Sequence, residues 1–316
     1  MGNLRVGVTG GTGFVGRYLL QCLKERNYSV NALSRKEKKH LSPEFKWYQG
    51  DINDLNSLFN FLENCDVVCN CAGEITNPQN YQKTNFNGVK TLYEASKQAG
   101  VDLFIQLSSA GIYKTPSEGF IYEESQLHAY DGYEKSKLDA DEWLFSQKEI
   151  RTIILRPTTI YGPDMPNQSL KALLNSVLNG KFFFIGSKKA ISSYMSVENL
   201  VDAVLQVIEK KEDLSIDELC QAYNLSHDIS FEEFIDLSSK SLLVKTPKLR
   251  IPLVLVLLLL KLNKMSLNLK LPLTENRARA LARLSSFSSN KFEDSFLWKP
   301  KLPHSVTINN CVKEWF

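Results

Sequence analysis

The sequence predicts an α/β protein with a doubly wound parallel sheet, followed by a smaller and irregular C-terminal domain. Three observations indicate this fold. Short apolar runs alternate with longer helical patterns in the first half of the chain, a glycine-rich turn follows the first apolar run, and the alternation stops after Pro157. Such alternation is typical of βαβ units, whose parallel strands are covered by helices on both faces.

The elements follow from these patterns in chain order. The expected strands are Arg5–Thr9, Ser29–Leu33, Phe45–Tyr48, Asp66–Cys71, Leu103–Leu107 and Thr152–Leu155. The helices expected between them are Gly13–Glu25, Leu55–Glu63, Asn80–Ala99 and Gly132–Gln147. Beyond Pro157, helical patterns at Leu170–Leu178, Val197–Glu209 and Phe231–Leu242 mix with short extended pieces. A chain of 316 residues is long enough for two domains at ~150 residues each.

Composition and charge exclude several classes of protein. Hydrophobic residues make up 43% and charged residues 23% of the chain, which argues against wholesale disorder. The net charge of +3 is too small and too dispersed for a nucleic-acid binder. Cys65, Cys69 and Cys71 lie in or beside a buried-strand pattern, and the four histidines have no ligand spacing, so we expect no metal site.

The sequence also bears on location. No charged and then apolar leader precedes the first strand, so a cytoplasmic protein is the expectation. The apolar run Ile251–Leu260 spans about half of the ~20 residues that a bilayer-crossing helix needs, so no integral membrane segment is expected. A buried or half-buried helix is the favoured interpretation of this run, with an interfacial membrane contact as the alternative.

The turn after the first strand predicts a dinucleotide site. Gly10 permits a tight turn, Gly13 lets the backbone approach a pyrophosphate, and Gly16 allows the helix to pack closely on the strand. The strand before this turn and the helix after it are the context that the motif requires. We therefore expect residues 1–165 to form an NAD(P)-binding Rossmann domain, to which the helix near 197–210 returns. Residues 166–316 are then mainly the substrate-binding domain. The loop residues expected to contact the cofactor are Gly10, Thr12, Gly13, Phe14, Val15 and Gly16.

The end of the second strand favours NADP over NAD. NAD-binding proteins usually place an acidic side chain there, but this strand ends in Ser34 and Arg35. The Arg35 guanidinium can pair with a 2′-phosphate, which a carboxylate would repel. NAD remains the alternative cofactor. Asp51, after the third strand, is expected at the adenine edge, although a plain loop aspartate is nearly as good a reading.

A second cluster predicts acid–base chemistry. Tyr133 and Lys137 lie four residues apart and so share one face of a helix. A nearby ammonium and an oxidised nicotinamide favour the phenolate form, which makes Tyr133 a candidate proton shuttle. Ser109 follows a strand at the sheet edge where ligands bind, and it can hydrogen-bond the reacting oxygen.

Together these motifs resemble the extended short-chain dehydrogenases/reductases, the branch of NAD(P)-dependent epimerases, dehydratases and reductases of nucleotide-activated sugars. The matching segments are TGGTGFVG at 9–16, NCAG at 70–73, NFNGVKTLYEASKQAGV at 85–101, LSSAGIY at 107–113, YEKSK at 133–137 and LRPTTIYGP at 155–163. By this resemblance Ser109, Tyr133 and Lys137 take the catalytic positions, and Tyr133 and Lys137 also contact the cofactor. The further cofactor contacts that it implies are Ile52, Cys71, Ala72, Gly73, Asn85, Pro157 and Thr158.

Departures from the family pattern narrow the expected reaction. The 4,6-dehydratases carry an Asp and a Glu after the catalytic hydroxyl, whereas this chain has Ala110 and Gly111, so dehydration is not expected. The family's usual Arg and His before the helix at 197 align with Ser192 and Ser196, which weakens the expected grip on a nucleotide diphosphate. The candidate replacements are Lys188, Lys189, Arg277 and Arg279, which are equally well read as exposed surface charges.

The leading hypothesis is NADPH-dependent reduction of a 4-keto-deoxysugar nucleotide, a step that belongs to polysaccharide biosynthesis. An NAD-dependent nucleotide-sugar 4-epimerase is the alternative, and a non-catalytic NADP(H)-binding regulatory or structural subunit is the alternative of another class. A small-molecule alcohol dehydrogenase is a further reading. The resemblance also implies a homodimer that pairs through the helices near 80–99 and 132–147.

Overall fold

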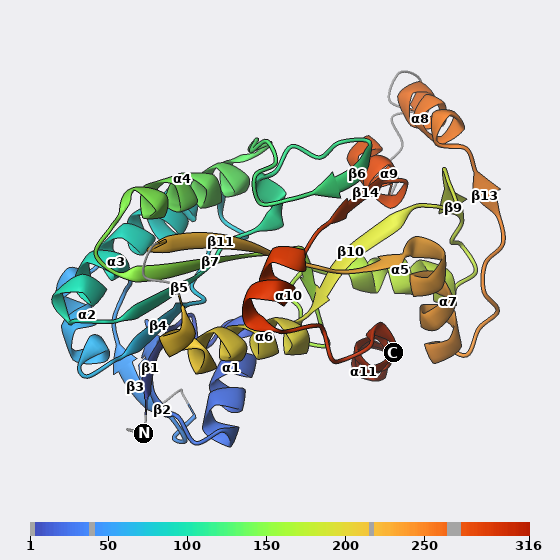
Figure 1. Cartoon of the computed structure of the whole chain (residues 1–316). Coiled ribbons are helices and arrows are strands. Elements are labelled where there is room, and N and C mark those ends of the chain that lie inside the picture. Colours follow the sequence, from blue (N-terminus) through green and yellow to red (C-terminus); the bar gives the residue numbers. More distant parts are fainter. Residues whose placement is uncertain (1–3, 38–41, 215–217, 264–272) are drawn as a thin grey trace.

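The centre of the molecule is a seven-stranded sheet in which every neighbouring pair of strands is parallel (Figure 1). The computed structural model describes residues 4–37, 42–214, 218–263 and 273–316. The strand order is β11-β7-β5-β4-β1-β2-β3. The strands are β1 (Arg5–Thr9), β2 (Ser29–Ser34), β3 (Lys46–Gln49), β4 (Val67–Asn70), β5 (Leu103–Leu107), β7 (Arg151–Pro157) and β11 (Cys220–Leu225). This is the predicted doubly wound sheet.

The order of the strands reverses at β1, which pairs with β2 on one side and with β4 on the other. Val8 is the register partner of Ala32 in β2 and of Cys69 in β4. In open α/β sheets, ligands bind outside the carboxyl ends of the strands at such a reversal. The fold therefore marks the ends of β1 and β4 as the entrance to a site.

Helices cover both faces of this sheet (Figure 1). One face carries α1 (Phe14–Glu25), α6 (Val197–Glu209) and α10 (Asn290–Phe296), and the other carries α2 (Leu55–Leu62), α3 (Gly88–Gln98) and α4 (Gly132–Ser146). Leu19 and Leu23 of α1 are buried in one core, and Phe61 of α2 and Tyr93 of α3 are buried in the other. Two separate apolar cores thus enclose the sheet, as its nearly continuous apolar strands require.

The helix predicted over Asn80–Ala99 is interrupted near its start. The structure has a 3₁₀ turn at Pro78–Asn80 (η2), a π-helical turn at Gln82–Asn87 (η3), and α3 only from Gly88. Asn85 lies in the π-helical turn, where its buried side chain donates one hydrogen bond to Ser136 Oγ at 3.0 Å. Such wide turns are frequent at functional sites because they redirect a side chain without ending the helix.

Apart from β11, α6 and α10, the described part of the second half forms five helices and, together with β6 of the first half, three small sheets. The sheets pair β12 (His227–Ser230) with β10 (Ile191–Ser196) and β10 with β8 (Thr159–Tyr161), β13 (Arg250–Ile251) with β9 (Phe184–Ile185), and β14 (Leu284–Phe287) with β6 (Glu118–Ile121). The helices are α5 (Ser169–Leu178), α7 (Phe231–Ser241), α8 (Leu253–Leu262), α9 (Glu275–Leu281) and α11 (His304–Trp315). Short 3₁₀ turns lie at Ala110–Ile112 (η4) and Lys211–Asp213 (η5).

Segments from both halves of the chain share sheets. The strand β11 and the helices α6 and α10 return to the large sheet, and β6 leaves the first half to pair with β14. The smaller region has its own apolar core, in which Tyr161, Phe234 and Ile308 are buried. In Figure 1 this region lies beyond one end of the large sheet, with α8 at its periphery.

Candidate active site

The glycine turn is shaped so tightly that side chains are excluded from it. Gly10 has a φ of 64°, and a Cβ there would lie 2.6 Å from the backbone carbonyl of Cys71. A Cβ at Gly16 would lie 2.2 Å from Gly10 O, so α1 packs directly on the turn. Gly13 begins α1 without a side-chain cap, and both Thr12 and Gly13 are exposed. Phe14 and Val15 follow it half-buried in the first turn of α1. Open backbone N–H groups at a helix start are the feature that binds a pyrophosphate, so the turn fits a dinucleotide.

A chain of buried polar side chains joins the ends of three strands next to this turn. Thr9 of β1 donates to Asn70 of β4, and Asn70 Nδ2 donates to Gln106 Oε1 of β5 at 2.8 Å. Gln106 Nε2 then donates to Leu107 O at 2.9 Å. Because buried polar groups need partners, this hydrogen-bonded network fixes the relative positions of the strand ends on which the site is built.

The loop after β4 runs between the glycine turn and Lys137. Cys71 and Ala72 are half-buried, and an ideal Cβ at Gly73 would lie 3.6 Å from Lys137 Nζ. Asn85 holds this loop in place, since its Oδ1 accepts from Glu74 N at 2.8 Å and its Nδ2 donates to Glu74 O at 3.0 Å. These four predicted cofactor residues therefore lie together between the glycine turn and Lys137.

The residues predicted to meet the adenosine lie at the carboxyl ends of β2 and β3. Ser34 is buried at the end of β2 and accepts from Lys36 N at 3.0 Å, whereas Arg35 is exposed. Asp51 Oδ1 accepts two hydrogen bonds from Asn53, each 2.9 Å long. Burial raises the pKa of Asp51, but the Asn53 bonds and the positive charge of Arg35 outweigh this and leave the pKa below its ordinary value.

Ile52, the next residue, is buried and occupies the space that a Cβ at Gly88 would take, 2.5 Å away. It packs α3 against the loop after β3. The structure thus places Ile52 in the wall beside Asp51, on the same side as Arg35 of the neighbouring strand end.

The three predicted catalytic side chains meet at the end of β5. Ser109 accepts from Gly111 N at 3.0 Å and begins η4, and it is also a hydrogen-bond partner of Tyr133. Tyr133 lies in the first turn of α4, whose N-cap Asp131 accepts from Glu134 N at 2.9 Å. Lys137, one turn further along, is buried and its Nζ donates to Leu107 O at 2.9 Å.

Burial sets the acid–base state of Tyr133 and Lys137 in the cofactor-free protein. Desolvation raises the pKa of Tyr133 to about 12, and the Ser109 hydrogen bond opposes this shift. Desolvation also lowers the pKa of Lys137 to about 8, while the charge of Asp141 opposes that change. In the cofactor-free protein burial dominates and Tyr133 is a protonated phenol; that the ammonium and an oxidised nicotinamide together favour the phenolate stays a prediction.

Asp141 lies one helical turn after Lys137 on the same face of α4, and its negative charge raises the pKa of Lys137. It is fully enclosed and pairs with Arg156 of β7, Nε to Oδ2 at 2.9 Å. Burial raises the pKa of Asp141, and the Arg156 charge opposes the rise. Arg156 also donates to Tyr113 Oη at 2.6 Å, so the pair belongs to a buried polar network beneath the site.

Pro157 and Thr158 close the opposite wall of the site. Pro157 ends β7, and Thr158 N donates to Leu225 O at 2.9 Å. The Thr158 and Ser226 hydroxyls are hydrogen-bonded at 3.1 Å, so Thr158 is buried and fixed. Both residues lie at the carboxyl end of β7, which neighbours β5 in the sheet.

On the substrate side, the basic residues that the sequence offered as replacements lie on the surface. Lys188, Lys189, Arg277 and Arg279 are all exposed. Ser196 caps α6 by accepting from Asn199 N at 3.2 Å, and Ser192 is buried in β10.

Two residues that the sequence did not single out lie near the site. Arg283 lies within electrostatic reach of Tyr194 and Asp228, and its buried Nε has no hydrogen-bond partner among the described residues. Tyr194 is the register partner of Thr159, directly after Thr158.

Glu134 is the second such residue. Its Oε1 lies 3.2 Å from an ideal Cβ at Gly111, and burial raises the pKa of its carboxyl group. Only the β10–β8 pairing and the fold of α4 bring these side chains to the site.

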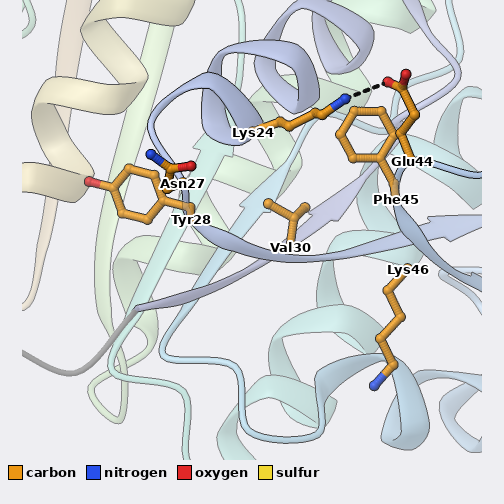
Figure 2. Close-up of a pocket in the computed structure, with 7 residues that line it drawn as sticks. All are labelled: Lys24, Asn27, Tyr28, Val30, Glu44, Phe45 and Lys46. Carbon is orange, nitrogen blue, oxygen red and sulfur yellow. Dashed lines mark ion pairs between the residues drawn. The ribbon is translucent and has the colours of Figure 1, made fainter.

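A pocket of about 410 Å³ lies elsewhere on the sheet. Figure 2 shows its lining, which includes Tyr28, Val30 and Lys46 together with the ion pair of Lys24 and Glu44 at 2.9 Å. These residues lie at the amino ends of β2 and β3, whereas the glycine turn and the catalytic side chains lie at the carboxyl ends. The pocket therefore takes no part in the site described above.

Comparison with known proteins agrees with this geometry. The model of the NAD dependent epimerase/dehydratase family matches residues 6–228. The human sterol-4-alpha-carboxylate 3-dehydrogenase (decarboxylating) is 28% identical over 266 residues, covering 78% of this chain and 69% of that protein. The UDP-glucose 4-epimerase of Vibrio cholerae is 27% identical over 270 residues, covering 78% of each chain.

Solved structures share the whole fold at low sequence identity. The UDP-glucuronic acid 4-epimerase from Bacillus cereus in complex with NAD has a TM-score of 0.73 at 19% identity, covering 99% of this chain and 96% of that chain. RMD from Pseudomonas aeruginosa complexed with NADPH has a TM-score of 0.70 at 19% identity, covering 99% of each chain. Both halves of the chain therefore have counterparts of the same architecture.

Proposed function

Because the chain belongs to the NAD-dependent epimerase/dehydratase family of extended short-chain dehydrogenases/reductases, we propose that it reduces a ketone with NADPH. The observation that carries this proposal is the contact of Ser109 with Tyr133, with Lys137 one helical turn away. All three lie at the same sheet edge as the glycine turn. When bound, the nicotinamide supplies the hydride.

The side chains supply the proton and the alignment. The Ser109 hydroxyl donates a hydrogen bond to the substrate oxygen and holds it beside Tyr133. The phenol, whose pKa of about 12 keeps it protonated, gives its proton to that oxygen as negative charge develops there. Lys137, beside Gly73, stabilises the resulting phenolate until solvent restores the proton. A protonated tyrosine is the form that reduction requires.

The cofactor preference follows from the end of β2. Arg35 is exposed where a 2′-phosphate would lie, and Ser34 stands where NAD-binding proteins carry an acid. We assign NADP(H) as the preferred cofactor and NAD as the alternative. The residues assigned to its phosphate, adenosine and nicotinamide ends are those described above at the carboxyl ends of the strands.

The substrate class that we favour is a nucleotide-activated 4-keto-deoxysugar. Arg283, with its unpartnered Nε beside Tyr194, can receive an anionic group there. Ala110 and Gly111 carry no acid or base for dehydration. The alternative is a 4-epimerase, which oxidises and re-reduces one carbon with no net consumption of cofactor, and the Vibrio cholerae relative bears that name.

A second candidate substrate is a lipid-soluble cyclic alcohol or ketone. The human relative is named as a dehydrogenase of a sterol carboxylate. The same three side chains serve either substrate class, because both present an oxygen on the reacting carbon. What separates the two classes is the group that occupies the space near Arg283.

The test is to follow nicotinamide absorbance with NADPH and then NADH, against UDP- and dTDP-4-keto-6-deoxysugars and a panel of sterol ketones. We expect stoichiometric consumption of NADPH with a keto-sugar nucleotide. Interconversion of UDP-hexoses without net absorbance change would establish the epimerase instead. Turnover of sterol ketones alone would assign the second substrate class, and no turnover with any panel would contradict the proposed reaction.

We also propose a cytoplasmic homodimer that pairs through α3 and α4. Phe145, near the end of α4, is 39% exposed and is available to such an interface. Sedimentation equilibrium tests it directly: a dimer that Phe145→Glu dissociates supports the pairing, and a monomer in the unmodified protein contradicts it.

A further inference from the structure

The helix α8 is apolar on all sides, and only one of its faces is covered. Val256 is buried against Ile185 and Ala278, and Leu253, Leu257 and Leu260 pack beside it. The positions between them point away from this core. These outward side chains are Val254, Leu255, Leu258, Leu259 and Leu262, which are between 48% and 76% exposed. We call them the α8 outer face.

Such a face is unusual for a helix at the edge of a water-soluble domain. A surface helix normally shows charged or polar side chains opposite its apolar stripe. Here the opposite side holds five more apolar side chains, contiguous along the helix, and contiguous exposed apolar patches mark interaction sites. Figure 1 shows α8 projecting at the periphery of the smaller region, away from the large sheet.

Cationic side chains surround this face. Lys248 precedes α8, Lys261 lies in its last turn, and Lys188 and Lys189 follow β9, whose partner strand leads into α8. All four are exposed. The sequence contains seven lysines and arginines and no acidic residue between Leu237 and Thr274. Glu232 pairs with Arg250 and Glu275 begins the neighbouring helix α9, so the positive charge near the face comes from the four exposed lysines.

We propose that the α8 outer face docks on the surface of a membrane that carries anionic lipid headgroups. The exposed leucines enter the boundary between headgroups and acyl chains, and the surrounding lysines contact the headgroup phosphates and carboxylates. The helix lies along the surface, because ten residues span only ~15 Å of a hydrocarbon core about 30 Å thick. Among the described residues, none of the helices is both long and apolar enough to cross a bilayer.

Charge argues for a lipid surface over a second copy of this chain. Two α8 outer faces packed together would bring their lysines close to each other, which is repulsive at the edge of a dry contact. An anionic bilayer offers both the apolar depth that the leucines need and the opposite charge that the lysines need. The inference does not depend on the proposed reaction, since α8 contributes no side chain to the candidate active site.

The experiment is flotation of the full-length protein with vesicles of phosphatidylcholine, with and without one-third phosphatidylserine. We expect binding to the anionic vesicles and much weaker binding to the neutral ones. Leu259→Gln should weaken binding about tenfold, and Leu255→Gln with Leu259→Gln about 100-fold, since each removes an inserted leucine. The matched control is Leu297→Gln, a leucine that is 82% exposed beside α10, which should bind as the unmodified protein does.

A charge variant separates the two contributions. Lys248→Gln with Lys261→Gln should lose most of the preference for anionic vesicles, about tenfold, and added salt should have the same effect. Equal binding of the Leu259→Gln and Leu297→Gln variants would overturn the proposal. So would equal binding to both vesicle types, or dimerisation through α8 without vesicle binding. Cofactor affinity, measured for each variant, serves as the control for folding.

Discussion

The carboxyl ends of the large sheet and the α8 outer face differ in which side chains are buried. At the sheet ends, Thr9, Asn70 and Gln106 are buried and hydrogen-bonded to one another, and the neighbouring apolar side chains lie in two closed cores. At α8, large apolar side chains lie in contact with solvent. The first region is organised to hold groups at fixed positions. The second offers a surface whose composition matters more than its geometry.

The comparison predicts that single-atom changes matter at the sheet ends and not at α8. The largest expected effect is from Tyr133→Phe, which removes only the phenolic oxygen and should lower kcat by ~10³-fold, because proton transfer by a positioned side chain contributes 10²–10⁴. Cofactor affinity should change little. The matched control is Tyr122→Phe, an exposed tyrosine, which should leave kcat unchanged.

Equal turnover of the Tyr133 and Tyr122 variants would remove the basis for calling the sheet ends an active site. It would instead favour a cofactor-binding subunit without chemistry of its own.

The second prediction tests whether the sheet ends hold groups at fixed positions, and it concerns the glycine turn. Gly10→Ala places a Cβ 2.6 Å from the backbone of Cys71, so cofactor affinity should fall by at least about 100-fold as the turn shifts. Gly180 has the same φ of 64°, with nothing within 4 Å of its Cβ position. Gly180→Ala should therefore show only the cost of the left-handed backbone, about 1–2 kcal/mol of unfolding free energy, and unchanged cofactor affinity.

Isothermal titration with NADPH and urea unfolding measure the two quantities. If both glycine variants lose the same affinity, backbone strain and not the close approach of Cys71 explains the glycine at this turn.

The third prediction concerns the charges of Lys137 and Asp141. The Lys137 ammonium has a pKa of about 8, so the rate should fall as pH rises through that value and the charge is lost. The charge of Asp141 raises this pKa, and therefore Asp141→Asn should move the falling limb of the pH–rate profile to lower pH.

Asp141→Asn should also cost about 3–5 kcal/mol of unfolding free energy, because it leaves the buried Arg156 guanidinium without its carboxylate. The profile of kcat against pH distinguishes the two roles. Lost stability with an unmoved limb would make Asp141 a structural residue only.

The smallest expected effect concerns Arg35, the exposed residue after β2 that is assigned to the 2′-phosphate of the cofactor. Arg35→Ser should raise the KM for NADPH about tenfold and leave that for NADH nearly unchanged, since a single exposed charge pairs with the 2′-phosphate. The neighbouring exposed Lys36 gives the matched control, Lys36→Ser. A similar loss with both cofactors, or with both variants, would contradict the assignment of Arg35.

Much of the first region could be predicted from local patterns. The strands Arg5–Thr9 and Leu103–Leu107 and the helix Val197–Glu209 have the predicted bounds. The glycine turn is recognisable because its steric demand acts on consecutive residues. The spacing of Tyr133 and Lys137 likewise indicates one helix face, whatever packs against it. The apolar run at 251–260 was predicted as a buried or half-buried helix; a helix forms there, but only Val256 is fully buried.

The rest depended on contacts between distant parts of the chain. Nothing in the residues around Cys220 shows that β11 joins the edge of the large sheet beside β7, or that Arg283 comes to lie near Tyr194. The π-helical turn at Asn85 reflects a hydrogen bond to Ser136, 51 residues away.

By itself, then, the sequence determined the strands and helices of the first half, the glycine turn and the candidates for the catalytic side chains. Each of these follows from conformational preferences and spacings that act over a few residues. Only the tertiary structure decided that burial raises the pKa of Tyr133, that Lys137 is buried and that the outer face of α8 is not. Burial and the pKa shifts that it causes are sums over neighbours from many segments, and a linear pattern does not contain those neighbours.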